Sequence, residues 1–250
     1  MSQKRLGFLL FVGGLVLAGA RVAAAASDEL PVATGEYQIL LVGKRIGEEQ
    51  FHVYKDKKSY QVESTTTRYW PHPSQQRYAY KLDPSFQPDE LTHNLHDGGK
   101  LVTVELRKKG KNWRSEVKGK EIKKVQQDMG ERQNAEIDFG SPLFQWVTFR
   151  QLKLAAGERT GVEVVVLDGA GQSAQTVRRI KRTYTRLPDE EILMEGQEPV
   201  TASVYEVTEA ESSYRLWLDP SGFPMRSERE TPEGPLEVRR VRFQMTPGAW

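Results

Sequence analysis

The chain has 250 residues, with 36 basic and 34 acidic side chains, a net charge of +2 and no cysteine. This near balance of charge excludes the strongly basic surface that binds nucleic acids regardless of their sequence. The lack of cysteine excludes disulfide bonds, thiol catalysis and cysteine-ligated metal sites, so packing and backbone hydrogen bonds have to stabilise the fold.

The first residues have the pattern of a secretory signal peptide. Two basic residues precede an uncharged apolar run, 7–20, and the three alanines at 24–26 are small enough for a signal peptidase to read. The run is shorter than the roughly 20 apolar residues that a membrane-spanning helix needs. We therefore predict a signal peptide over 1–26 that is cleaved after Ala26, a periplasmic or extracellular location, and no integration into the membrane after cleavage.

The basic excess belongs to this N-terminal segment. Residues 1–26 hold three basic and no acidic side chains, so the rest of the chain carries 33 basic against 34 acidic ones. A nucleic-acid partner is therefore not expected. Local basic clusters, such as 107–109 and 239–242, are typical of the solvated face of a sheet, and the alternative is a positive stripe that meets anionic headgroups.

From Gly35 onward, short β-type runs alternate with turn signals every eight to twelve residues or so. In the first run Tyr37, Ile39 and Leu41 fall on one face, and a turn follows at 43–47. This rhythm predicts a mainly β fold with a single large antiparallel sheet. We expect the sheet domain to cover 35–246, after a flexible leader at 27–34.

Two segments echo each other at an Asp-Pro turn. Residues 80–85 and 216–221 each end a strand just before the sequence Asp-Pro-Ser. Either an internal duplication of two sheet halves or convergent turn chemistry explains the echo.

One segment breaks the strand rhythm. Ser141 and Pro142 provide an N-cap and a proline at the first helical position, and Gly157 provides a stop signal. The apolar residues between them surround most of the helix, which is typical of a buried helix. We predict one short central helix at about 141–156 that packs as a plug or lid against the concave side of the sheet.

Short motifs along the chain carry a resemblance to a group of bacterial proteins. The first two are Gly35-Glu36-Tyr37, followed by Val42-Gly43 and Ile46-Gly47, and Asp138 with Ser141-Pro142 ahead of Arg150-Gln151-Leu152. The third is Leu216-Trp217-Leu218 ahead of Pro224-Met225-Arg226. With these motifs the chain resembles exported bacterial envelope proteins of unknown function. The resemblance implies a single large, strongly curved antiparallel sheet, a half-barrel or open barrel similar to the half-barrels of periplasmic lipoprotein carriers. It implies no catalytic residues.

The polar residues do not assemble a recognisable reaction centre. His93 and His96 stand three apart, where strand residues face opposite sides, so solvent-facing histidines near a turn are expected rather than a metal site. No Gly-x-Ser-x-Gly elbow occurs, and no glycine-rich phosphate loop opens a helix. We predict no enzyme activity, no catalytic residue, no metal and no cofactor.

Aromatic residues are the best sequence clue to a ligand site. A curved sheet with few helices rarely fills its own concave face, which leaves an apolar groove. We predict that this groove is lined by Trp70, Trp113, Trp146, Phe144 and Trp217. Core packing is the competing explanation for these rings.

These observations predict a non-enzymatic periplasmic binding or carrier protein for an apolar or amphiphilic envelope molecule, such as a lipid, a glycolipid or an acyl chain. The alternative is a structural or assembly factor that docks another cell-envelope protein. A carrier requires a deep apolar cavity. An assembly factor requires a shallow, filled concavity with an exposed patch.

Overall fold

The computed structural model describes residues 30–120, 122–131, 135–168, 176–194, 198–210 and 212–248. The predicted signal peptide, 1–26, lies outside the described residues, as does the start of the predicted leader. Apart from Leu30, every described residue belongs to one compact unit, 31–250.

The first eight strands follow one another as antiparallel hairpins. They are β1 (Ala33–Leu41), β2 (Lys44–Lys55), β3 (Tyr60–Arg68), β4 (Ser74–Leu82), β5 (Pro88–Asp97), β6 (Lys100–Lys109), β7 (Asn112–Gly119) and β8 (Ile122–Glu131). The first strand thus begins inside the predicted leader, 27–34. A short strand, β9 (Ala135–Asp138), precedes the helix α1 (Pro142–Gln151).

The strands after the helix form a second series. They are β10 (Arg159–Asp168), β11 (Thr176–Arg186), β12 (Glu190–Ile192), β13 (Val200–Glu209), β14 (Ser212–Leu218), β15 (Pro224–Thr231) and β16 (Gly234–Met245). The 16-stranded sheet has the order β8-β7-β6-β5-β4-β3-β2-β1-β16-β15-β14-β13-β11-β10-β9, and β12 pairs with β13 beside this path. Only β9 and β10 are parallel among the described strand pairs.

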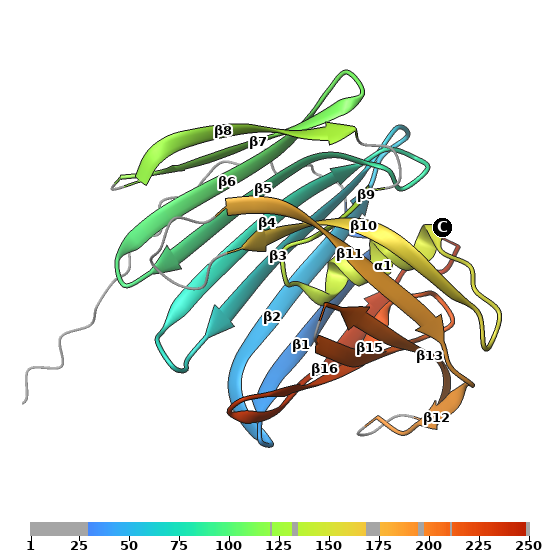
Figure 1. The fold of residues 1–250 in the computed structure, drawn as a ribbon. Coiled ribbons are helices and arrows are strands. Elements are labelled where there is room, and N and C mark those ends of the chain that lie inside the picture. The colour runs from blue at the N-terminus through green and yellow to red at the C-terminus, as the bar shows by residue number, and fades with distance from the viewer. Residues whose placement is uncertain are drawn as a thin grey trace, which may run out of the picture. The chain divides into compact units, whose positions relative to one another are not determined.

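The first and last strands join the two series, because β1 pairs with β16. The resulting sheet is curved and open, and α1 lies against it (Figure 1). The predicted mainly β fold, one large curved sheet with a single helix in the described part of the chain, is therefore confirmed. Strands β8 and β9 follow each other in the chain yet end at opposite ends of the strand order.

Two glycines of the N-terminal motif are required by close packing. A Cβ atom on Gly35 would lie 2.5 Å from the ring of Phe51, and one on Gly47 would lie 2.6 Å from the carbonyl oxygen of Thr67. Both distances are shorter than any side chain tolerates. The motif thus reports close contact within the sheet.

Aromatic rings fill the space between the sheet and the helix. The ring of Tyr37 stacks on Phe51 at 5.4 Å, and Phe51 stacks on Phe223 at 6.0 Å. Phe223 stacks in turn on Trp146 of α1 at 4.6 Å, and Trp146 meets the ring of Phe86 edge-on at 5.5 Å. This column connects β1 and β2 to the helix, so the concave side is packed with rings where the sequence predicted an open groove.

The start of α1 is held by a buried carboxyl group. Ser141 caps the helix, as predicted, with its Oγ accepting a hydrogen bond from the Leu143 amide at 3.2 Å. The same hydroxyl donates to the carboxyl group of Glu49 on β2, and Ser64 on β3 donates to it at 2.6 Å. Burial raises the pKa of Glu49. The seven residues 143–149 are all buried, as the apolar circumference of the helix predicts.

The helix ends at Gln151, earlier than the predicted boundary at about 156. Leu152 already has an extended backbone, and Leu152 and Leu154 pack against a second apolar cluster around Phe149 and Tyr184. The chain leaves the helix because these side chains find apolar partners outside the helical path. The glycine at 157 therefore belongs to the following turn.

Candidate ligand-binding cavity

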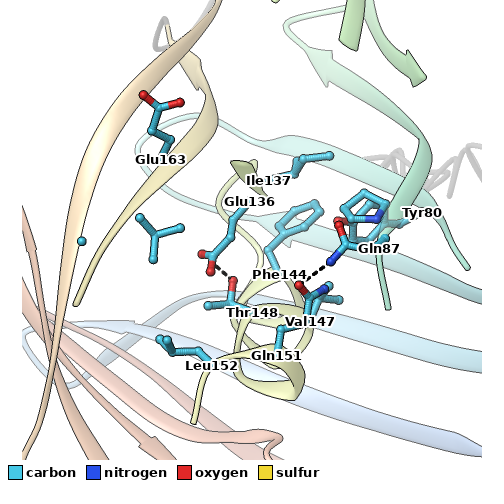
Figure 2. A pocket seen from close by; sticks show the side chains of 13 residues that line it. Tyr80, Gln87, Glu136, Ile137, Phe144, Val147, Thr148, Gln151, Leu152 and Glu163 are labelled. Carbon is cyan, nitrogen blue, oxygen red and sulfur yellow. Dashed lines mark hydrogen bonds between the residues drawn. The ribbon is translucent and has the colours of Figure 1, made fainter. Parts of the chain in front are cut away.

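A cavity of about 670 Å³ lies beside α1, between β9 and β10 on one side and the connection from β4 to β5 on the other (Figure 2). Its polar lining side chains are Gln87, Glu136, Thr148, Gln151 and Glu163. Its apolar lining includes Ile137, Phe144, Val147, Leu152 and Val162. Small-molecule sites in proteins typically measure about 300–1,000 Å³, so this cavity has the size of a binding site.

One row of the helix faces the cavity. Phe144, Val147, Thr148 and Gln151 all line it, and their spacing of three, four and seven residues places them on one helical face. The row begins with an aromatic ring and ends with an amide. The helix therefore supplies both apolar and hydrogen-bonding surface to the same cavity.

Glu136 on β9 is the acidic group in the lining of the cavity that hydrogen-bonds to α1. Thr148 Oγ1 donates to Glu136 Oε2 at 2.8 Å, and the Tyr184 hydroxyl donates to the same oxygen at 3.0 Å. Burial raises the pKa of Glu136 to about 7, although both hydrogen bonds and the nearby Arg182 act in the opposite direction. Both bonds end on one oxygen, so the carboxyl group can bind a ligand at the other.

Two amide side chains connect the edge of the cavity to the helix. Gln87 Nε2 donates to Gln151 Oε1 at 2.6 Å (Figure 2). Gln151 Nε2 donates to the carbonyl oxygen of Phe86 at 2.6 Å. Both side chains are exposed at this contact. The β4–β5 connection and the end of α1 are therefore tied together at the mouth of the cavity.

A buried ionic network fixes the walls behind the cavity. Arg182 on β11 donates to Asp138 Oδ2 at 2.7 Å and to Glu209 Oε1 at 3.0 Å. Gln145 of α1 donates to the same Asp138 oxygen at 2.6 Å. Asp138, a motif residue of the sequence resemblance, thus links β9, β11 and the helix.

Of the five residues predicted to line a groove, Phe144 lines this cavity. Trp146 and Trp113 are 0% exposed and belong to the central apolar cluster. Large rings fill the interior efficiently because each removes much apolar surface from water. Core packing, the competing explanation, accounts for both tryptophans.

The other two predicted residues lie apart from the cavity. Trp217 belongs to a separate apolar cluster, where its Nε1 donates to Glu190 at 2.8 Å and Arg226 lies over its ring at 5.2 Å. Trp70 lies in the connection after β3 and is 47% exposed. The structure therefore does not bring the five aromatic residues together.

Sequence reasoning missed the polar lining of the cavity. Once the helix is located, the spacing of three, four and seven residues from Phe144 to Gln151 shows that these side chains share one helical face. No sequence pattern indicates that Glu136 lines the cavity. Its position depends on the parallel pairing of β9 with β10, the strands that precede and follow the helix in the chain. Gln87 reaches the cavity only through the fold of the β4–β5 connection.

The prediction that His93 faces solvent is wrong. His93 is 1% exposed and stacks on the ring of Tyr78 at 4.6 Å. Burial lowers its pKa to about 4, so the neutral imidazole acts as a flat core residue. His96, by contrast, is exposed. The described residues contain no cluster of three metal-ligating side chains.

Within the described ranges, no helix has both the length and the apolar character that crossing a bilayer requires.

Residues 43–229 match the family described as "Putative glycolipid-binding", and this match covers most of the chain. The chain belongs to this family. None of the curated proteins compared with it matches.

Two solved bacterial structures are similar to this chain. A β-barrel-like protein of the DUF1849 family from Brucella abortus is 9% identical, covering 87% of this chain and 98% of its own, with a TM-score of 0.53. A DUF1089 family protein from Pseudomonas aeruginosa is 16% identical, covering 71% of this chain and 87% of its own, with a TM-score of 0.47. The Brucella likeness supports the β-sheet architecture alone. Export and similarity to lipoprotein carriers stay predictions.

Proposed function

We propose that this protein is a non-enzymatic binding protein for an amphiphile with a carbohydrate headgroup, held in the cavity beside α1. The observation that carries the proposal is the mixed lining of this cavity. Carboxyl, amide and hydroxyl groups lie beside apolar side chains in one space of about 670 Å³. The glycolipid-binding family supports the same class of ligand.

The polar side of the cavity suits sugar hydroxyl groups. A hydroxyl both donates and accepts hydrogen bonds, and the lining offers carboxylate acceptors at Glu136 and Glu163 and amides at Gln87 and Gln151. Both charged side chains that line the cavity are acidic, and Glu163 is already paired with Arg179 at 2.8 Å. An anionic headgroup would meet the Glu136 carboxylate, so a neutral headgroup fits better.

The apolar side of the cavity suits the start of a hydrocarbon chain or the apolar face of a sugar ring. Phe144, Val147 and Leu152 of the helix segment lie opposite Ile137 and Val162 of the strands. The aromatic column fills the concave side nearby, so the cavity encloses the headgroup and the first carbons, and the rest of the chain stays outside. This differs from the deep apolar groove predicted for a carrier.

The filled concave side favours the alternative function, an assembly factor that docks another envelope protein. This alternative needs no ligand in the cavity. A direct binding measurement therefore separates the two functions.

We expect alkyl glucosides to bind the protein more tightly than alkyl alcohols of the same chain length, as measured by calorimetry below the micellar concentration. Glu136→Gln should remove most of this preference. The affinity of the wild type should fall by up to about ten-fold per pH unit below pH 7, because hydroxyl donors favour the ionised Glu136, whose pKa is raised to about 7. Above pH 7 the affinity should be constant.

The matched control is Glu191→Gln, which removes an exposed carboxylate on β12. It should leave both the glucoside preference and its pH profile unchanged. Equal affinities for glucoside and alcohol would contradict headgroup recognition. A folded protein that binds neither probe would favour the assembly factor.

We also propose that the protein works outside the cytoplasm. The basic start, the apolar run 7–20 and the alanines at 24–26 support this location. Mature protein recovered from the periplasm or medium should begin at Ser27, as determined by N-terminal sequencing. A cytoplasmic protein that retains Met1 would contradict export.

A further inference from the structure

Several hairpin turns meet at one end of the sheet. The strand order places the β1–β2, β3–β4 and β5–β6 turns beside one another, with the β15–β16 turn next to the β1–β2 turn (Figure 1). The Tyr69 amide donates to the carbonyl oxygen of Ile46 at 2.7 Å, and Ser74 pairs with Asp97. The β3–β4 turn is therefore flanked on both sides. We call this end the turn rim.

The turn rim exposes apolar and aromatic side chains. Tyr69 and Trp70 are 48% and 47% exposed, and Val42 and Leu101 on the flanking turns are also exposed. These four make up half of the large hydrophobic side chains that are exposed in the described part of the chain. The segment 69–73 contains no lysine, arginine, aspartate or glutamate.

Cationic side chains flank this aromatic segment. Lys44 and Arg45 stand on the β1–β2 side, and Lys100 stands on the β5–β6 side, all of them exposed. The acids at this end are Glu36 and Glu48, which both lie near Tyr69, the partly buried Asp97, and Glu233 on the outer turn. Glu48 pairs with Arg45, so Lys44 and Lys100 are the cations that flank the aromatic tip on its two sides.

We propose that the turn rim docks on an anionic lipid surface. Tryptophan and tyrosine favour the boundary between headgroups and acyl chains, because one end of each ring system is apolar and the other is polar. Lysine and arginine beside them are attracted by anionic headgroups. The aromatic tip enters the boundary region while Lys44, Arg45 and Lys100 remain among the headgroups.

Docking by the rim goes beyond ligand binding in the cavity, and the two sites lie at different ends of the sheet. Strand β4 runs from Ser74 at the rim to Leu82, and the next connection carries Gln87 to the cavity. Rim variants should therefore leave alkyl-glucoside binding unchanged. A failure of one proposal can thus be told from a failure of the other.

The experiment mixes the protein with vesicles of phosphatidylcholine that contain phosphatidylglycerol with brominated acyl chains. Wild type and variants carry the same N-terminus, so any membrane affinity of residues 7–20 is common to all. All proteins in this experiment carry Trp250→Phe, because Trp250 lies outside the described residues. We expect quenching of tryptophan emission that is absent when Trp70→Phe is added, because Trp113, Trp146 and Trp217 are buried. Unchanged quenching in Trp70→Phe would overturn the proposal.

Charge reversal tests the cations of the rim. Lys44→Glu with Lys100→Glu should lower partitioning to the anionic vesicles by at least about five-fold per residue. The matched control, Lys109→Glu with Lys111→Glu, reverses two exposed cations at the β6–β7 turn, on the opposite end of the sheet. Equal losses in both pairs, or equal binding of the wild type to vesicles of phosphatidylcholine alone, would overturn docking by the rim.

Discussion

Replacement of Trp146 by alanine is expected to lower the free energy of unfolding by about 3–5 kcal/mol. The ring is 0% exposed, stacks on Phe223 at 4.6 Å and meets Phe86 edge-on at 5.5 Å. It lies within the aromatic column that fills the concave side, between Phe223 and Phe86, so its removal leaves a cavity that the surrounding rings cannot close. Denaturant unfolding followed by circular dichroism measures the loss.

Trp70→Ala is the matched control, because it removes the same side chain from an exposed position. Its free energy of unfolding should change by less than about 1 kcal/mol. A loss of that size for Trp146→Ala would show that the ring does not belong to the core, and the filled concave side would then need another explanation.

The second large effect is expected at the buried ion pair of the C-terminal Asp-Pro turn. Arg240 donates to Asp219 Oδ2 at 2.6 Å, and the two side chains are only 6% and 8% exposed. Asp219→Ala should lower the free energy of unfolding by about 3–5 kcal/mol, because it leaves the Arg240 charge buried without its carboxylate. The same unfolding measurement tests this value.

The other Asp-Pro turn provides the control. Asp83 Oδ1 accepts from the amides of Ser85 and Gln87, both at 2.9 Å, as Asp219 Oδ1 accepts from the amides of Ser221 and Phe223. Asp83 is more exposed than Asp219. Asp83→Ala should therefore cost less, about 1–2 kcal/mol, because a partly exposed carboxylate contributes little beyond its hydrogen bonds.

A double variant separates the ion pair from the turn. Asp219→Ala with Arg240→Met should recover part of the loss, because the unpaired buried charge is gone. If Asp219→Ala and Asp83→Ala cost the same, the ion pair contributes nothing beyond the turn.

The sequence echo between residues 80–85 and 216–221 has a direct structural counterpart in these turns. In both, the aspartate carboxylate binds the amides two and four residues later. Shared turn chemistry is enough to explain the shared letters. The distinct partner, Arg240, comes from β16 and is invisible to a local comparison.

Local physical chemistry was enough to predict the elements of the fold. The alternation of apolar residues and the turns after each run predicted the antiparallel sheet, because side chains on a strand alternate between its faces. Ser141 and Pro142 predicted the start of the helix, because each satisfies a requirement of the first helical turn. The predicted end of the helix at about 156 is wrong, because Leu152 and Leu154 leave the helical path for partners that are distant in sequence.

The cavity depended on tertiary structure. The sequence does not show which aromatic residues contact one another. It therefore predicts Trp146 and Trp113 in the groove, whereas both rings fill the core. Glu136 reaches Thr148 and Tyr184 only because β9 returns to the far end of the sheet and pairs with β10 in parallel. Composition and periodicity thus determined that this protein is built from a mostly antiparallel β-sheet with a buried helix that begins at about 141. The pairing of distant strands decided which side chains face a ligand, because burial and hydrogen bonding at this site depend on neighbours that the chain order does not reveal.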